Sequence, residues 1–250
     1  FISQSFDWRI CYFIGGGLGL CLLLLRISVF ESGMYTEVKE QKIARGNFLM
    51  FFNSKKRLKK YLLSILIGLP TWYVIGILIA FSNKFGKEFG LPEKINPGKA
   101  TMYAYMAISV ADVLIGFISQ WLRSRKKALF IFYGITVITL VLYFTQHNTN
   151  STVMYMIIAG LGFSTGFWAI FVTMAAEQFG TNLRATAATT VPNMVRGSLP
   201  LMIFVFNLLQ QYVSYVEAGI ITGVIVMSIS IIAAWYSEET FGKDLNYIEA

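Results

Sequence analysis

The segment that decides the fold is residues 61–82, which read YLLSILIGLPTWYVIGILIAFS and contain no charged side chain. A helix needs roughly 18–20 apolar residues to cross about 30 Å of hydrocarbon, so this segment is long enough to span a bilayer. Six further stretches share this length and apolar character: residues 10–28, 101–121, 128–145, 153–175, 187–212 and 216–236. The runs are continuously apolar and do not alternate, so they predict transmembrane helices and not barrel strands. The predicted fold class is therefore an all-α membrane protein with seven transmembrane helices.

The composition agrees with this interpretation and argues against a metalloenzyme. Hydrophobic residues make up 56% of the chain and charged residues 14%, which leaves too little polar surface for a water-soluble domain of this length. Cys11 and Cys21 lie in one apolar run without metal-ligand spacing, and the single histidine, His147, lies in a short polar loop. We expect no enzyme activity, metal or cofactor.

The basic residues are confined to particular loops, although the net charge of +8 would suggest nucleic acid for a soluble protein. Two loops hold most of them: Lys39, Lys42, Arg45, Lys55, Lys56, Arg57, Lys59 and Lys60, and then Arg123, Arg125, Lys126 and Lys127. Loops 146–152 and 213–217 have neither Lys nor Arg. The positive-inside rule places the basic loops in the cytoplasm, so the N-terminus is expected outside and the tail inside a cell membrane, the inner or plasma membrane.

Three motifs at span ends resemble those of one family of membrane proteins. Residues 177–186, EQFGTNLRAT, resemble the E-x-F-P-x-x-x-R signature that follows the tenth helix of major facilitator superfamily transporters. Residues 116–127, GFISQWLRSRKK, are similar to that superfamily's G-x-x-x-D-R-x-G-R-R-K loop between the eighth and ninth helices. Residues 26–32, RISVFES, resemble the R-x-x-x-x-E-S that closes its sixth helix. The three matches occur in the family's order.

The resemblance implies that the seven spans are the sixth to twelfth helices of a twelve-helix carrier of small solutes, of the metabolite/proton symporter kind. Residues 1–31 would then be the last helix of a truncated N-terminal bundle and 32–60 a cytoplasmic linker. Residues 61–237 would be a complete C-terminal six-helix bundle, and 238–250 a cytoplasmic tail. Residue 1 is phenylalanine with no cleavage site before the first span, so we expect a fragment whose beginning is missing.

Departures from the family motifs limit what the resemblance implies. Gln120 and Arg123 replace the loop motif's aspartate and glycine, so a charge relay through that aspartate is absent or rerouted. Gly180 replaces proline. The second span has Pro70–Tyr73 where hexose carriers have paired glutamines, so no sugar substrate is inferred.

Two charged residues within the spans are candidates for substrate binding or ion coupling. Arg196 lies twelve residues beyond Arg184, roughly 18 Å along a helix, and therefore near the bilayer midplane. With Asn193 it could bind an anionic group such as a carboxylate, or it could form a structural pair with another helix. Asp112 lies at comparable depth. It could bind and release a coupling proton, balance the charge of Arg196, or simply bond a neighbouring helix.

Aromatic residues on two spans complete the candidate substrate site. Trp72 and Tyr73 in the second span and Trp168 in the fifth could stack on a solute and donate hydrogen bonds to it, or they could only fill space between helices. Tyr103 and Tyr105 are expected to lie in the interfacial aromatic belt.

Four charged residues are predicted to form a cytoplasmic gate. The resemblance implies that Glu31, Arg125, Glu177 and Arg184 form a salt-bridge network that holds the outward-open state and breaks when the carrier opens inward. The two arginines could instead simply follow the positive-inside rule, but this rule does not account for the two glutamates.

The predicted function is secondary, proton-coupled transport of a metabolite such as an organic or amino acid, by alternating access. Its partners would be the solute, the bilayer, protons and the missing N-terminal bundle, with no nucleic acid. A seven-helix receptor or a channel is the alternative. The chain lacks the D-R-Y and N-P-x-x-Y motifs of receptors, a lysine in the last span as in retinal pigments, and a filter-like loop as in channels.

Overall fold

The computed structural model describes residues 7–27 and 46–249 and divides the chain into two compact units, Phe1–Ile43 and Ala44–Ala250. Within the described residues, seven helical segments are long and apolar enough to cross a membrane. They confirm the all-α membrane class and the seven spans predicted from the sequence. In the first unit, α2 (Trp8–Ile27) forms the first span, and its side chains from Tyr12 to Arg26 are exposed.

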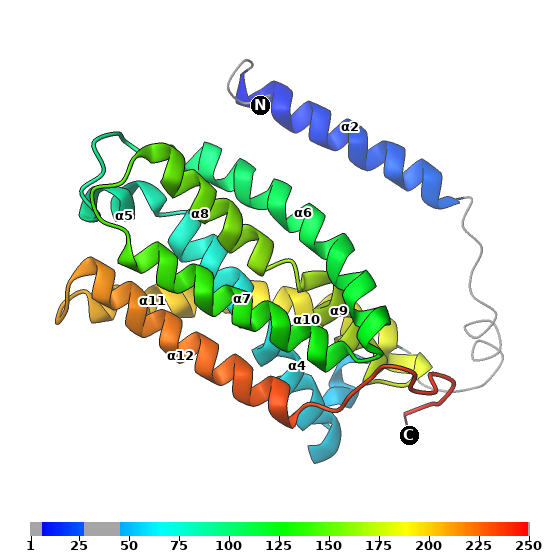
Figure 1. Cartoon of the computed structure of the whole chain (residues 1–250). Coiled ribbons are helices and arrows are strands. Elements are labelled where there is room, and N and C mark those ends of the chain that lie inside the picture. Colours follow the sequence, from blue (N-terminus) through cyan, green and yellow to red (C-terminus); the bar gives the residue numbers. More distant parts are fainter. Residues whose placement is uncertain (1–6, 28–45, 250) are drawn as a thin grey trace. The chain divides into compact units, whose positions relative to one another are not determined.

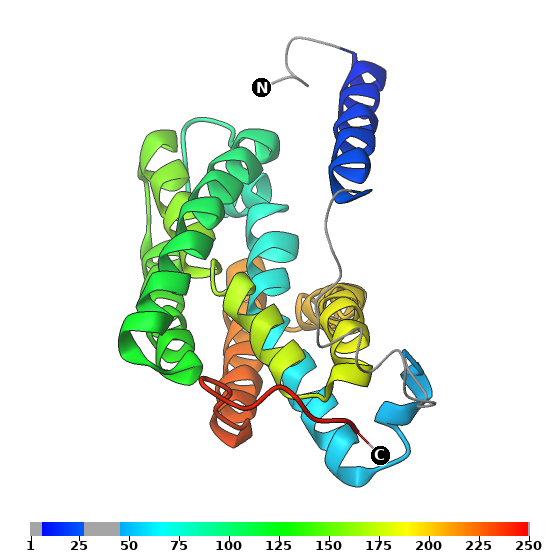
Figure 2. The ribbon, with the colours of Figure 1, turned by 90° about the vertical axis from the view of Figure 1, so that its right-hand side faces the viewer.

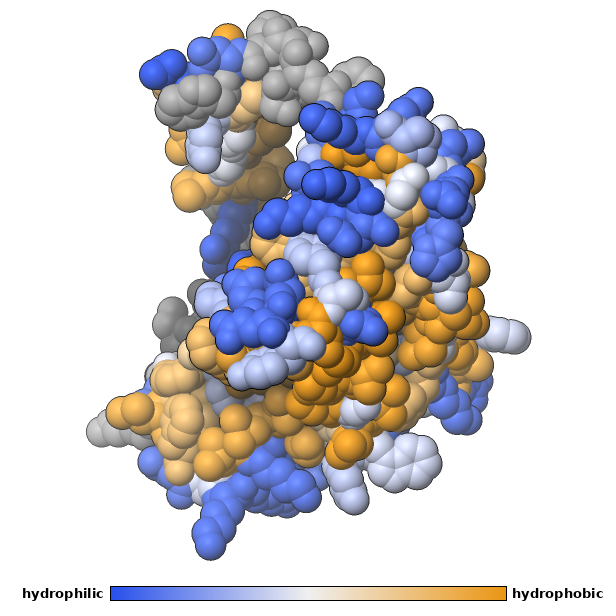
Figure 3. Space-filling model, turned by 90° about the vertical axis from the view of Figure 1, so that its left-hand side faces the viewer, coloured by the Kyte–Doolittle hydropathy of each residue, from blue (hydrophilic) through white to orange (hydrophobic). Residues whose placement is uncertain are grey.

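The second unit is a bundle of six spans joined by connections at both ends (Figure 1). Its elements, in chain order, are η1 (Phe48–Phe51), α4 (Lys55–Tyr73), η2 (Val74–Ile79), α5 (Ser82–Glu88), α6 (Pro97–Leu122), α7 (Arg125–Thr145), α8 (Ser151–Ser164), α9 (Trp168–Glu177), α10 (Thr181–Gly197), α11 (Leu199–Leu209) and α12 (Tyr215–Tyr236). We call the end with the first turn of α4, the α6–α7 turn and the tail 237–249 the basic end. Figure 3 looks onto the opposite end, where hydrophilic residues gather and hydrophobic residues flank them.

Two predicted helix starts differ most from the structure. The second span begins at Lys55 and not at residue 61, because the basic segment continues the helix beyond the apolar run. The sixth span begins at Thr181 and not at residue 187. Hydropathy marks only the part of a helix that fits the hydrocarbon, whereas the hydrogen-bonded helix extends past it.

Local sequence signals fix where several helices begin and end. Side-chain caps start α6 at Asn96, α7 at Ser124 and α8 at Asn150, and Ser214 forms a capping box with Glu217 at the start of α12. The last turn of α6 closes at Arg123, whose φ of 47° is left-handed, a conformation that usually requires glycine. The family motif has glycine at this position, so the departure at Arg123 places a bulky side chain in an unfavourable backbone conformation.

Buried hydroxyl groups satisfy the backbone of the second span, where a proline and a wide turn disturb the helix. Pro70 has no N–H to donate to the carbonyl of Leu66, and Ser230 Oγ of α12 donates to this oxygen instead, at 2.7 Å. Tyr143 Oη donates to the carbonyl of Leu78 at 3.0 Å, within the π-helix η2. Side chains of neighbouring helices thus provide hydrogen bonds where no water is available.

Three spans of the bundle depart from regular α-helix between their ends. The second changes to π-helix at Val74–Ile79, the fifth breaks between α8 and α9 at residues 165–167, and the sixth breaks at Ser198. At the second break α6 lies very close, because a Cβ added to Gly166 would meet Ala111 Cβ at 2.2 Å. Irregular backbone at membrane depth is tolerated where it is buried in protein or lines a cavity. A cavity is therefore expected between these three irregular segments.

Candidate functional site

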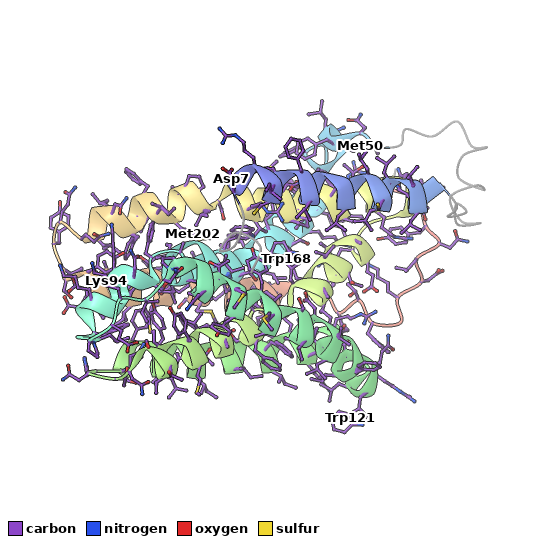
Figure 4. The ribbon with its side chains drawn as sticks, turned by 90° about the horizontal axis from the view of Figure 1, so that it is seen from above. Asp7, Met50, Lys94, Trp121, Trp168 and Met202 are labelled. Atoms are coloured by element: carbon purple, nitrogen blue, oxygen red, sulfur yellow. The ribbon has the colours of Figure 1, made fainter. Side chains whose placement is uncertain are left out.

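A cavity of about 220 Å³ lies where the three irregular segments meet. Four residues of its wall were predicted from the sequence: Trp72, Asp112, Trp168 and Arg196. The irregular backbone positions three of them. Trp72 comes just before η2, Trp168 opens α9, and Arg196 stands in the last turn of α10. Figure 4 shows Trp168 midway along the bundle, between Lys94 at one end and the tail at the other.

Arg196 is held in place by an aromatic ring and an amide. Its guanidinium carbon lies 5.2 Å from the centre of the Trp72 ring, and its Nη1 donates to Asn193 Oδ1 at 3.3 Å. A cation over an indole face is stabilised by the ring quadrupole, and neither contact neutralises the positive charge. The guanidinium therefore offers its charge and its remaining N–H donors to an anionic group.

Asp112 connects α6 to the start of α9. Its Oδ1 accepts a hydrogen bond from the backbone N–H of Ala169 at 3.1 Å, in the first turn of a helix that has no side-chain cap of its own. A carboxylate at this position also interacts favourably with the helix dipole. Within residues 7–27 and 46–249, no ion pair joins Asp112 to Arg196, although both line the cavity. The two oppositely charged side chains thus line the same cavity without forming an ion pair with each other.

Two residues of the cavity wall each have a buried polar atom without a hydrogen-bond partner within the described residues: Thr71 Oγ1 and Trp72 Nε1. A helical threonine usually donates to the carbonyl four residues earlier, but Tyr133 Oη already donates to this carbonyl, that of Ile67, at 2.6 Å. A buried polar group without a partner is costly in an apolar medium. These two groups are therefore well suited to bind a polar solute.

Two predicted residues do not line the cavity: Asn193, which contacts Arg196, and Tyr73. Several cavity residues were not predicted. Tyr73 is fully buried on another side of its helix, where its Oη donates to the carbonyl of Gly219 at 2.7 Å. Tyr105 and Ser109 line the cavity, although Tyr105 was expected in the interfacial belt. Both share a face of α6 with Asp112, at i, i+4 and i+7 counted from Tyr105, and this spacing is the sequence signal that could have identified them. The remaining wall residues are Thr71, Ile75 and Ile108.

At the basic end, two of the four predicted gate residues form an ion pair. Arg125 Nη2 lies 3.2 Å from Glu177 Oε1, and both side chains are largely buried, with 14% and 13% of their surface exposed. Arg184 instead donates to the carbonyl of Leu245 in the tail. Glu31 lies outside the described residues.

The tail runs across the end of α9 (Figure 2), and it contacts both members of this ion pair. Thr240 Oγ1 donates to Glu177 Oε2 at 2.6 Å, and the Phe241 ring centre lies 5.4 Å from the guanidinium carbon of Arg125. Beyond it, Tyr247 Oη donates to the carbonyl of Gln178 at 2.9 Å, and Glu249 N–H donates to Asn182 Oδ1 at 3.0 Å. The tail thereby connects α7, α9 and α10.

Glu239 caps the first turn of α7. Its carboxylate accepts hydrogen bonds from Ser124 Oγ and from the backbone N–H groups of Arg125 and Lys126. Burial alone raises the pKa of the Glu239 carboxyl, but the hydrogen bonds from Ser124 and from backbone amides outweigh burial and lower this pKa below its ordinary value. The loop motif has aspartate at position 120, where this sequence has glutamine. The carboxylate at the start of α7 comes instead from Glu239 of the tail.

Comparison with known proteins gives two matches. Residues 1–199 match the sequence profile of the Major Facilitator Superfamily. Over 233 residues, 91% of this chain, the sequence is 26% identical to the Protein TsgA homolog of Buchnera aphidicola subsp. Baizongia pistaciae (strain Bp). The chain spans 54% of the length of that relative. No solved structure matches the chain.

Proposed function

Because this chain belongs to the major facilitator superfamily of membrane transport proteins, we propose that it forms part of a carrier that moves a small solute by alternating access. The bundle would face a second bundle across the solute pathway, in a cell membrane, with the basic end toward the cytoplasm. The observation that carries this proposal is the convergence of three irregular helices on one cavity that holds an arginine, an aspartate and two unpartnered polar atoms.

The solute would carry a carboxylate, as organic acids and amino acids do. Arg196 would bind the carboxylate, since its charge is not neutralised by Trp72 or Asn193. Thr71 Oγ1 and Trp72 Nε1 would satisfy further polar groups of the solute, and Trp168 would limit the size of the site.

Proton coupling would use Asp112. Asp112 is the acidic residue among the described residues that line the cavity. Its Oδ1 accepts a hydrogen bond from the backbone at the start of α9, directly after a helix break. Protonation would weaken this contact and free α9 to move relative to α6. The Arg125–Glu177 pair at the basic end would serve as the cytoplasmic gate.

The test is uptake of labelled organic and amino acids by proteoliposomes that contain the complete carrier, this bundle together with the second one, with and without an imposed proton gradient. Asp112→Asn should abolish accumulation driven by protons and preserve exchange of solute, whereas Arg196→Gln should raise KM by about tenfold or more. Arg123→Gln removes an arginine outside the cavity and is the control. Uptake with unchanged KM in Arg196→Gln would rule out the carboxylate site, and unchanged accumulation in Asp112→Asn would rule out coupling through this residue.

A further inference from the structure

A second cavity, of about 430 Å³, lies at the basic end between the first turns of α4 and the tail. It is separate from the cavity at the helix breaks, with which it shares no wall residue. Its charged wall residues come from both segments: Lys56, Arg57, Lys60, Glu238, Lys243 and Glu249. The two segments are far apart in sequence, so this cavity exists only when the tail is in place.

The charges of this cavity do not balance. Glu238 Oε2 lies 3.1 Å from Lys60 Nζ and 3.5 Å from Lys243 Nζ, and it therefore joins the tail to α4. Glu249 Oε2 lies 4.0 Å from Arg57 Nη1. Among the described residues of its wall, four cationic side chains against two carboxylates leave two positive charges in excess. A solvent-filled cavity with this excess attracts an anion of one or two negative charges.

The first turn of α4 adds to this preference. Ser54 is the residue before the helix, and its side chain makes no capping hydrogen bond, although it lines the cavity. Its hydroxyl therefore remains available to acceptor oxygens, and the helix dipole favours negative charge there. Lysine, arginine and hydroxyl donors together form the usual environment of a protein-bound phosphate group.

The neighbouring face of α4 is suited to an acyl chain. An apolar hollow of about 350 Å³ on the same turns is lined by Leu58, Leu62 and Leu63, with Lys55 and Lys59 beside them. A ligand with a phosphate group in one cavity and a hydrocarbon chain in the other is a phospholipid. The location at the end of a transmembrane helix is also where lipid phosphates lie.

We propose that the cavity between α4 and the tail binds the phosphate group of an anionic phospholipid. The bound phosphate would place its charge between Lys56 and Lys243, on opposite walls, and would hold the tail against α4. Since the tail also contacts Arg125 and Glu177, the lipid would stabilise the arrangement in which this pair is covered.

The experiment is a thermal unfolding titration of the purified protein in an uncharged detergent. Phosphatidylglycerol should raise the melting temperature in a saturable way, whereas phosphatidylcholine at the same concentrations should have little effect. Lys56→Gln and Lys243→Gln should each raise the half-saturating concentration of phosphatidylglycerol by about tenfold, the change expected for loss of one charge-assisted hydrogen bond. Lys56 is exposed, so its substitution removes a charge without disturbing packing.

The matched control is Lys127→Gln, which removes an exposed positive charge at the same end of the bundle, from a residue that lines neither cavity. Its titration should coincide with that of the unchanged protein. An equal loss in Lys127→Gln, or equal stabilisation by phosphatidylcholine, would overturn the proposal, because either result indicates unspecific attraction. Sodium phosphate that reproduces the saturable shift, with the same dependence on Lys56 and Lys243, would assign the cavity to a soluble phosphate and overturn the lipid assignment.

Discussion

Arg125 and Glu177 form an ion pair that the C-terminal tail covers, with Thr240 bonded to the carboxylate and Phe241 against the guanidinium. The pair is largely shielded from water, so loss of one partner leaves a buried charge without compensation. Removal of one partner should therefore cost more stability than removal of one partner of an exposed salt bridge.

Glu177→Gln should lower the free energy of unfolding by about 3 kcal/mol, because it leaves Arg125 buried without its counter-charge. Denaturant unfolding in detergent measures the change. Asp244→Asn, in an exposed part of the tail, provides the comparison and should change stability by less than about 0.5 kcal/mol. Similar losses in the two variants would contradict the assignment of a buried pair.

Gly166→Ala should destabilise the bundle by about 1–3 kcal/mol, because the new Cβ would meet Ala111 Cβ at 2.2 Å and force α6 away from the break between α8 and α9. Gly134→Ala, within α7, has no atom within 4 Å of the added Cβ and should leave stability unchanged or raise it slightly. Thermal unfolding of both variants decides the matter. A stable Gly166→Ala protein would show that the close approach of α6 is not required.

Arg123→Gly should stabilise the protein by about 0.5–1 kcal/mol, because glycine adopts the left-handed conformation at φ 47° without the steric cost of a Cβ. The same replacement at Lys127, within the first turns of α7, should instead destabilise by about 1 kcal/mol. The melting temperatures of the two variants should therefore shift in opposite directions. A decrease for both would indicate that the Arg123 side chain contributes more than its backbone conformation costs.

The attachment of the tail should weaken in acid through Glu239. A carboxyl whose pKa is lowered by folding contributes stability above its unfolded pKa, and this contribution disappears as the pH falls through the lower, folded value. Limited proteolysis of the tail at decreasing pH should therefore accelerate below the ordinary pKa of a glutamate. Glu239→Gln should be cleaved faster at neutral pH and should lose most of this pH dependence. A tail equally protected in both proteins would exclude Glu239 as its anchor.

Trp72→Phe should raise the KM for the transported solute by about five- to tenfold, because it removes the unpartnered Nε1 donor and keeps an aromatic ring beside Arg196. The concentration dependence of uptake into proteoliposomes measures the effect. Trp121→Phe is the matched control, since Trp121 is 83% exposed and projects away from the bundle (Figure 4). Equal KM values in the two variants would remove Trp72 from the solute site.

The number of spans could be predicted because each is a long apolar run, and charged residues such as Arg196 and Asp112 stand out within these runs. The exact positions of the helix breaks could not be predicted. Residues 165–167 interrupt an apolar stretch where Gly166 lies against Ala111 of α6, and Ser198 lies between Arg196 and Pro200.

The path of the tail could not be predicted from the sequence either. The hydrogen bond between Ser124 and Glu239 joins residues 115 positions apart, and no periodicity connects them. Tyr73 shows the opposite problem, in which two residues adjacent in sequence do not share a site. Its position beside Trp72 suggested a shared role, but neighbouring helical residues point about 100° apart, and Tyr73 bonds to α12 instead.

The π-helical turn η2 also affects whether the second span tolerates a change in length. The hydrogen bond from Ala80 N–H to the carbonyl of Ile75 spans five residues, so η2 holds one residue more than an α-helical turn. Deletion of one residue there would restore α-helical geometry and leave the flanking turns in their present orientation. The second span can therefore lose one residue without rotating Trp72 relative to α5, and alignments of related chains should tolerate a single gap at this point.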